Sequence, residues 1–392
     1  MVIKLSARVG RIRPSPTLAV TARAAELRRQ GKDVIGLGSG EPDFDTPDHI
    51  KQAAIKAIQN GITKYTAVEG TPELKRAVIS KFQRENDLRY EAKQVLVSVG
   101  GKQSFYNLAQ ALLNPGDEVI IPAPYWVSYP DMVLLADGVP VIVYAGIEQG
   151  FKLTPSQLEE AITPRTRLFV INSPTNPTGV TYTATELKAL GEVLLRHPHV
   201  LVATDDMYEH IRWESNKFVN ILNVTPELYP RCIVLNGVSK AYAMTGWRIG
   251  YAAGPADLIA AMGNVQSQST SNPASISQVA AQAALDGGLD CIVPMVKAFK
   301  ERHDFIVSGL NSIQGMKCIK STGAFYAFPA VHELMERLPG IRDDVHLSEY
   351  ILEQVGVAAV PGSAFGAPGY LRFSFATSMD MLRQALERLN RL

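Results

Sequence analysis

The sequence predicts an α/β fold, with a large domain on a mostly parallel sheet covered by helices and a smaller α+β domain. Three observations lead to this prediction. The 392 residues suffice for two domains. From residue 95 onward, short apolar runs alternate with segments of helical periodicity, as in parallel strands joined by helices. After residue 275 the alternation is replaced by long helical segments and then short strands.

The N-terminal segment is expected to join the small domain. A helix is predicted over residues 16–30, with Ser15 as its N-cap and Gly31 just after its end. A short strand at residues 34–37 then leads into Gly38-Ser-Gly40, where glycines allow another group to approach the backbone closely.

The central part of the chain supplies the large domain. Helices are predicted at residues 47–60, 71–86 and 102–113. The predicted strands cover residues 95–99, 118–121, 139–144, 167–171, 200–203, 233–235 and 249–253. Ligands of such sheets bind beyond the carboxyl ends of the strands, so the loops that follow these runs are candidate site loops.

The C-terminal part supplies the small domain. Helices are predicted at 276–285, 291–312 and from Met379, with strands at 323–328, 357–360 and 371–375. The expected division is an N-terminal segment at 1–45, a large domain at 46–290 and a small domain at 291–392.

Composition excludes several classes of function. Lys plus Arg is 39 and Asp plus Glu is 38, so no nucleic-acid partner is expected. No apolar stretch approaches ~20 residues and no secretory signal is evident, so no membrane partner is expected. Cys232, Cys291 and Cys318 have neither metal-site nor disulfide spacing, which predicts no metal and a cytoplasmic location.

Lys240 is the central candidate residue. It lies between two apolar runs, in a stretch poor in charge, with Arg248 eight residues on. Burial lowers the pKa of a lysine from about 10.4, and a neutral amine condenses with an aldehyde. The alternative is an ordinary lysine on a surface loop.

Other loops carry weaker candidates. Gly101 and Lys102 stand where a helix begins, which favours phosphate, although a plain turn would look similar. Asp205 follows a strand and could pair with a protonated ring nitrogen, or simply cap a helix, while Tyr208 could bond a ring hydroxyl.

Three further residues have both a functional and a structural interpretation. Asn176 lies in a Pro-rich loop and could hydrogen-bond a ring or only belong to a turn. Trp126 could stack on a flat cofactor or pack in the core. Arg372 lies in an apolar strand, where its guanidinium would fit a carboxylate ligand or form a structural ion pair.

Together these motifs resemble a known family along the whole chain. The matching stretches are residues 40–47, 64–65, 99–103, 124–129, 172–179, 205–208, 239–250 and 321–326, with Arg372. In order and spacing they are similar to the class I, fold type I aminotransferases of the aspartate aminotransferase family, close to the bacterial thermophilic-type branch. That family uses pyridoxal 5'-phosphate (PLP).

The resemblance implies a role for each matching residue. Lys240 would bond covalently to the cofactor and shuttle the proton. The other cofactor contacts would be Tyr65 (from the second subunit of a homodimer), Gly101, Lys102, Trp126, Asn176, Asp205, Tyr208 and Arg248. The substrate contacts would be Gly40, Trp126, Asn176, Arg372, Lys102 and Arg13, the last in accepting prephenate. The family also implies cis peptides at Ala123–Pro124 and Asn176–Pro177.

The implied reaction is transamination between L-aspartate and 2-oxoglutarate, with small amino and 2-oxo acids as partners. One departure from the family is Gly237, where the commonest aspartate aminotransferases have a phosphate-binding serine. The arginine that reads a distal carboxylate also has no obvious counterpart. A broader aromatic, kynurenine or prephenate aminotransferase and a PLP-dependent C–S lyase therefore remain as alternatives. A non-catalytic regulator and a nicotinamide-dependent oxidoreductase are disfavoured, because a DNA-binding extension and a G-x-G-x-x-G motif are missing.

Overall fold

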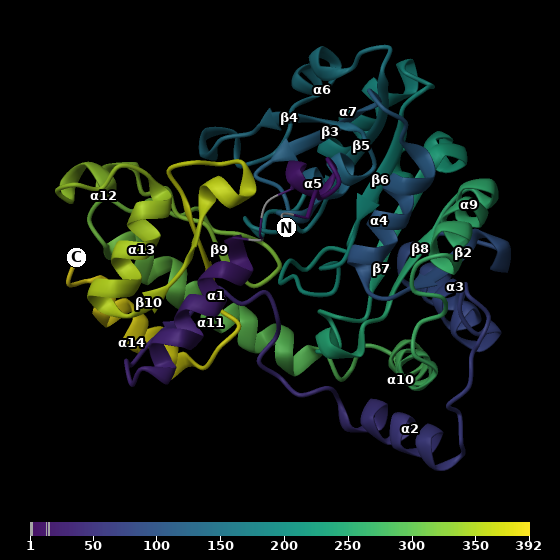
Figure 1. Ribbon diagram of the computed structural model, residues 1–392, viewed down its shortest axis with the longest axis horizontal. Helices are drawn as coiled ribbons and strands as arrows, with labels where there is room; N and C mark the ends of the chain where they lie inside the picture. The colour runs from purple at the N-terminus through teal and green to yellow at the C-terminus, as the bar shows by residue number, and fades with distance from the viewer. Residues whose placement is uncertain (1–2, 13, 15) are drawn as a thin grey trace.

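A seven-stranded sheet forms the centre of the larger part of the molecule (Figure 1). The structure is a computed structural model, and it describes residues 3–12, 14 and 16–392. The strands are β2 (Val95–Ser98), β3 (Glu118–Ala123), β4 (Val139–Tyr144), β5 (Thr166–Asn172), β6 (Leu201–Asp205), β7 (Cys232–Gly237) and β8 (Gly250–Ala253). Their spatial order is β2-β8-β7-β6-β5-β3-β4.

The pairing of these strands places the site loops at one edge. β8 runs antiparallel to both β2 and β7, while the pairs from β7 to β4 are all parallel. The carboxyl ends of β2 to β7 and the amino end of β8 therefore share one edge of the sheet. The predicted mostly parallel sheet is confirmed, and each predicted strand lies within two residues of an observed one.

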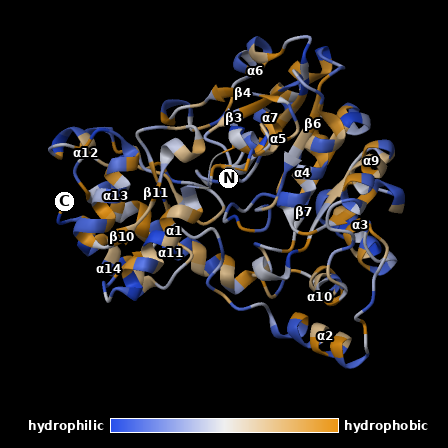
Figure 2. Ribbon diagram, viewed as in Figure 1, coloured by the Kyte–Doolittle hydropathy of each residue, from blue (hydrophilic) through white to orange (hydrophobic). Residues whose placement is uncertain are grey.

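Helices cover both faces of the sheet, which is why its strands are apolar on both sides. Every residue of β2, β7 and β8 is buried. Figure 2 shows the strands mainly in orange and the surrounding helices with orange and blue faces. The helices of this part are α2 (Asp48–Gln59), α3 (Pro72–Asn86), α4 (Gly101–Leu112), α5 (Ser128–Leu135), α6 (Pro155–Ala161), α7 (Ala184–Arg196), α8 (Ile221–Val224), α9 (Ala256–Ser267) and α10 (Ser275–Asp286).

The smaller part combines the two ends of the chain. Its helices are α1 (Pro16–Arg29), α11 (Val293–Ser312), α12 (His332–Arg337), α13 (Asp344–Val355) and α14 (Met379–Leu389). β1 (Ile35–Gly36) pairs in parallel with β10 (Val357–Ala358). β11 (Val360–Pro361), β12 (Leu371–Ser374) and β9 (Tyr326–Ala327) form an antiparallel sheet in that order. Figure 1 shows α1, in purple, beside the yellow-green elements of the C-terminal part.

Short 3-10 helices complete the secondary structure. They are η1 (Val9–Arg11), η2 (Ala92–Gln94), η3 (Ile147–Gln149), η4 (Pro226–Arg231), η5 (Thr245–Trp247) and η6 (Gly362–Phe365). No helix among the described residues is both long and apolar enough to cross a membrane.

Some expectations change in detail. The single strand predicted at 357–360 is two strands, β10 and β11, because the chain changes its pairing partner from β1 to β12 there. Ser15, the predicted N-cap, lies outside the described residues. The fold class is confirmed, whereas the division at residues 45 and 290 stays a prediction.

Candidate active site

A cavity of about 350 Å³ opens at the edge of the sheet where the strands of the large part end. It is lined by loops that follow β2, β3, β5, β6 and β7, and by residues of the smaller part. Its walls include Thr17, Leu18, Gly40, Gly101, Lys102, Trp126, Val127, Ser128, Asn172, Asn176, Asp205, Met207, Tyr208, Leu235, Ser239, Lys240, Thr245, Arg248, Tyr326 and Arg372.

Lys240 lies in the loop that joins the antiparallel strands β7 and β8. Its Nζ donates a hydrogen bond of 2.6 Å to the carbonyl oxygen of Gly40. Burial, followed by the charges of Arg372 and Arg248, lowers the pKa of Lys240 to about 8. A usable fraction of this amine is therefore neutral near neutral pH, as a nucleophile for an aldehyde requires.

One end of the cavity is suited to a phosphate. α4 begins at Gly101, so its first amide groups have no acceptor within the helix and lie at the positive end of the helix dipole. The guanidinium of Arg248 contacts this turn, with its Nη2 3.3 Å from the carbonyl oxygen of Val99. Burial and the nearby Arg248 charge lower the pKa of Lys102. Two neighbouring cations at a helix N-terminus favour an anion there.

Two glycines, Gly100 and Gly250, lie where this turn contacts the start of the neighbouring strand β8. A Cβ on Gly100 would lie 2.3 Å from Nη2 of Arg248, and one on Gly250 would lie 2.3 Å from the backbone nitrogen of Gly101. The backbone contact at Gly250 leaves no room for a side chain, whereas at Gly100 the positive φ of 85° favours glycine and the Arg248 side chain would have to move.

Asp205 lies at the end of β6, in the depth of the cavity. Tyr129, at the start of α5, donates a hydrogen bond of 2.5 Å to its carboxylate, and the backbone nitrogen of Met207 donates another of 3.2 Å. Burial raises the pKa of Asp205 despite these two donors. A protonated ring nitrogen close to this carboxylate would offset the burial and favour the ionised form. The helix-cap alternative does not hold, because the residues directly after β6 form a turn and the next helix, α8, begins only at Ile221.

Two tyrosine hydroxyls form the wall next to Asp205. The hydroxyl oxygens of Tyr208 and Tyr326 lie 2.8 Å apart in a hydrogen bond. Burial, together with the neighbouring hydroxyl, raises the pKa of Tyr208 well above its usual value, so the phenol remains protonated and can donate. Trp126 also lines the cavity, with the ammonium of Lys102 5.4 Å from its ring centre.

Arg372 is buried in β12, yet it has no ionic partner in the part of the chain that the structure describes. Its Nη1 donates to Asn176 Oδ1 at 2.9 Å and its Nη2 to the carbonyl oxygen of Gly38 at 2.7 Å. Its Nε is buried without a partner, and among the described residues no carboxylate lies within 4.0 Å of the guanidinium. A buried, uncompensated guanidinium next to a cavity calls for an anionic ligand.

The structure brings most of the predicted site residues together. Ten of them line this one cavity: Gly40, Gly101, Lys102, Trp126, Asn176, Asp205, Tyr208, Lys240, Arg248 and Arg372. Tyr65 does not, because its side chain is 92% exposed on the surface of this chain. Arg13 lies outside the described residues. The two predicted cis bonds are confirmed, and Ser173–Pro174 is a third cis bond that was not predicted.

Several residues of the site carried no clear signal in the sequence. Tyr129 and Tyr326 were part of matching motifs, but their hydroxyl partners, Asp205 and Tyr208, are 76 and 118 residues away in the chain. Gly237 also gains a physical explanation. A Cβ there would lie 3.0 Å from the carbonyl oxygen of Ile249 and 3.2 Å from the Met207 methyl group, so a serine would force its neighbours to move.

Comparison with known proteins adds independent evidence. The sequence profile of the class I and II aminotransferases matches residues 32–389. The chain is 62% identical to the aspartate/prephenate aminotransferase of Nitrosomonas europaea, over 99% of each chain. It is 53% identical to the aspartate aminotransferase of Geobacillus stearothermophilus, over 99% of this chain and 98% of that protein.

Solved structures give the same result. The aspartate aminotransferase of Rhizobium meliloti superposes with a TM-score of 0.96 at 50% identity, covering 100% of this chain and 98% of the other. The Thermus thermophilus aspartate aminotransferase with maleate gives a TM-score of 0.93 at 45% identity, covering both chains completely. These similarities extend over the whole chain.

Proposed function

The chain belongs to the class I and II aminotransferases, and from that premise we propose that it transfers the amino group of L-aspartate to 2-oxoglutarate. The products are oxaloacetate and L-glutamate, and the cofactor is PLP. The observation that carries this proposal is one cavity lined by a lysine of lowered pKa, by Asp205 at the end of β6, and by a buried arginine that has no ionic partner among the described residues. The names of the relatives support aspartate as the amino donor.

The residues present fit the cofactor. The free amides at the start of α4, with Arg248 and Lys102, suit its phosphate. Asp205 suits its ring nitrogen, Tyr208 and Asn176 its ring oxygen, and Trp126 its ring face. When bound, PLP supplies an electron sink for the substrate α-carbon.

The protein residues supply position and proton transfer. Arg372 and Asn176 hold the substrate α-carboxylate, with the Gly40 backbone nearby, so that the α-hydrogen faces Lys240. The Lys240 amine would remove the α-proton at Nζ and give it up later in the same half-reaction. The Asp205 carboxylate would favour the protonated form of the cofactor's ring nitrogen, and Tyr129 holds that carboxylate in place.

A second candidate substrate is prephenate, which appears in the names of several relatives. The apolar side chains of Leu18 and Val127 at the cavity wall offer contact to a six-membered ring. Initial rates with 2-oxoglutarate as acceptor and aspartate or phenylalanine as donor, and with prephenate as acceptor, separate the two. We expect the highest kcat/KM with aspartate and measurable transfer to prephenate. A rate with phenylalanine that exceeds the rate with aspartate would contradict the proposed substrate.

We propose that the enzyme is a homodimer with shared sites. Figure 1 shows α2 at the lower edge of the molecule beside α10. Ile55, Ile58 and Ile62 are 43%, 55% and 41% exposed on and just after this helix, close in sequence to the exposed Tyr65. Apolar side chains gathered in one surface segment favour burial against a second chain. Tyr65 would then reach the phosphate end of the neighbouring cavity.

Mixing two defective variants tests this sharing. Tyr65→Ala is expected to weaken PLP binding about tenfold, the equivalent of one hydrogen bond to a charged group. Lys240→Ala is expected to be inactive. When both variants are unfolded and refolded together, a mixed dimer has one site with Lys240 and Tyr65 both intact. Activity at low PLP should therefore rise above that of either variant refolded alone, and a mixture that gains nothing would contradict a shared site.

A cytoplasmic location is also proposed. The three cysteines are unpaired in the structure, and two of them, Cys232 and Cys318, are buried. Free thiols persist most readily in a reducing compartment.

A further inference from the structure

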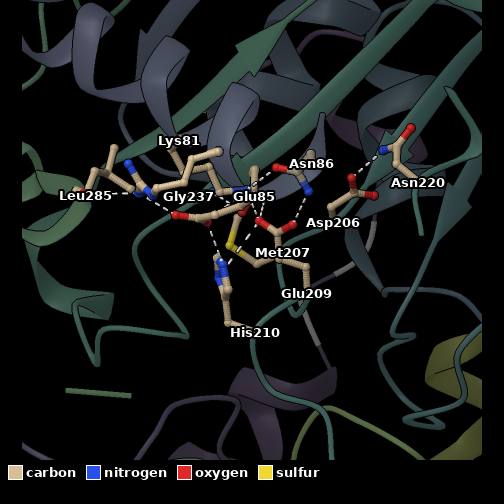
Figure 3. A network of polar contacts seen from close by, with 12 residues as sticks. Lys81, Glu85, Asn86, Asp206, Met207, Glu209, His210, Asn220, Gly237 and Leu285 are labelled. Carbon is tan, nitrogen blue, oxygen red and sulfur yellow. Dashed lines mark hydrogen bonds and ion pairs between the residues drawn. The ribbon is translucent and has the colours of Figure 1, made fainter. Parts of the chain in front are cut away.

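Figure 3 shows a network of charged and amide groups around the chain segment that directly follows Tyr208 of the candidate active site. Its centre is the carboxylate of Glu209, which is 4% exposed and follows Tyr208 directly in the chain. The ammonium of Lys81, from α3, makes an ion pair with Glu209 and donates a hydrogen bond of 2.7 Å to Asn86. Asn86 Nδ2 in turn donates to Glu209 Oε2 at 2.6 Å. Lys81, Asn86 and Glu209 therefore satisfy one another.

The same carboxylate reaches the strand that leads to Lys240. Asn236 Nδ2, near the end of β7, donates to Glu209 Oε1 at 2.6 Å. Asn236 Oδ1 accepts a hydrogen bond of 2.7 Å from the backbone nitrogen of Gly237. Both residues of this contact are buried. Glu209 thus connects α3 to two chain segments, one carrying Asp205 and Tyr208, the other leading into the Lys240 loop.

Glu85, His210 and Arg84 form an outer set of polar contacts next to this network. Glu85 Oε2 lies 2.8 Å from His210 Nε2, and Arg84 pairs with Glu85 at 2.5 Å while its own side chain is 47% exposed. Burial alone would raise the pKa of Glu209, but the charges of Lys81 and His210 and the hydrogen bonds of Lys81 and Asn86 lower it to about 2. Glu209 is therefore ionised throughout the range in which the enzyme is handled.

A bound metal ion is the competing explanation for this cluster. Glu85, Glu209 and His210 offer ligand atoms within 4.8 Å of one another. The ammonium of Lys81, however, contacts Glu209 and lies 3.7 Å from Glu85, so the positive charge among these groups is already supplied. Asn86 and Asn236 also donate to Glu209, so three of the roughly four acceptor positions of its carboxylate have protein donors.

We propose that Glu209 is a positioning residue for the reaction centre. Its carboxylate ties the segment after β6 to the end of β7, so that Asp205 and Lys240 keep a fixed separation. The inference rests on the proposed function, because it is the aldehyde carbon and the ring nitrogen of one cofactor that require this separation. No contact between Glu209 and substrate is involved. Lys81 and Asn86 serve as the anchor on α3, and Asn236 transmits the position to the Lys240 loop.

The test uses the purified holoenzyme and the variants Glu209→Gln, Asn236→Ala and their combination. Four properties are measured: kcat, the dissociation constant of PLP, the apparent pKa of the visible absorption band of bound PLP, and the midpoint of thermal unfolding. A misplacement of about 1 Å can cost ~100-fold in rate. For each single variant we expect a 10- to 100-fold loss of kcat, roughly tenfold weaker PLP binding, and a shift of the band pKa by about half a unit or more.

The combined variant tests whether the two residues act through their shared contact. If they do, its loss of PLP affinity should be no larger than that of the worse single variant, whereas independent effects would add. Asn236→Ala removes no charge, so it carries the test if Glu209→Gln does not fold. Arg84→Gln is the matched control, because Arg84 touches the outer layer but not Glu209. It should change PLP affinity by less than about twofold.

Two results would overturn the inference. One is a normal PLP affinity and band pKa in both single variants, even with a lower unfolding midpoint, since a purely structural ion pair would behave so. The other is additive losses in the combined variant. A wild-type protein that cannot bind PLP would instead contradict the proposed function itself, so the two failures are distinguishable.

Discussion

Replacement of Lys240 by alanine should reduce turnover by roughly 10⁴-fold, the upper range for loss of a positioned acid–base group. It should also abolish the covalent attachment of PLP. Burial lowers the pKa of Lys240 to about 8, and its Nζ donates a hydrogen bond to the Gly40 carbonyl oxygen. Alanine leaves the phosphate and ring contacts in place, so the cofactor can still enter without forming the bond.

The measurement combines steady-state rates with chemical trapping. Borohydride reduction followed by mass spectrometry should add one PLP per wild-type chain, on the peptide that contains residue 240, and none in the variant. Lys188→Ala, on the exposed surface of α7, is a control that should behave like the wild type. A trapped adduct on another lysine, or an unchanged turnover number in Lys240→Ala, would refute the assigned role.

Replacement of Arg372 by leucine should lower kcat/KM for amino acids by roughly 10²- to 10⁴-fold. Two charge-assisted hydrogen bonds to a carboxylate contribute about 1.5–3 kcal/mol each, and each 1.4 kcal/mol corresponds to about tenfold. The loss should appear mainly in KM, because the carboxylate is bound in the ground state as well as in the transition state. Amine substrates without an α-carboxylate should lose almost nothing.

Two further expected results make this test specific to the Arg372 guanidinium. Arg372→Lys keeps the charge but loses the forked geometry, so it should fall between wild type and Arg372→Leu. The Arg372 charge also lowers the pKa of Lys240, so its removal should raise that pKa above about 8. The variant apoprotein should therefore need a higher pH than the wild-type apoprotein to bind PLP at the same rate. Equal losses for substrates with and without the carboxylate would contradict the assignment.

The sequence was informative where function depends on local features. Lys240 between two apolar runs, and Gly101 at a strand-to-helix turn, could be recognised because their neighbours in the chain determine their setting. Arg372 was recognisable because a guanidinium in an apolar strand needs an anionic partner. The parallel sheet then brought these distant loops to one edge, as its topology requires.

The interactions that support the site were not predictable in the same way. Glu209 is followed by a histidine in a polar stretch and reads as a surface residue, although it is buried against Lys81, 128 residues earlier. Tyr129 likewise contacts Asp205 only because the fold brings the start of α5 near the end of β6. Such pairs depend on the relative placement of whole elements, about which residue type and periodicity carry no information. The split of residues 357–360 between two sheets has the same origin.

The visible absorption spectrum of the purified protein tests the central claim most directly. With PLP bound, the enzyme should be yellow, because a conjugated bond joins the cofactor to Lys240. Addition of aspartate should bleach this band within the turnover time, and subsequent 2-oxoglutarate should restore it, since the two half-reactions run in opposite directions. A protein that takes up no PLP, or whose band does not respond to aspartate, would contradict the account.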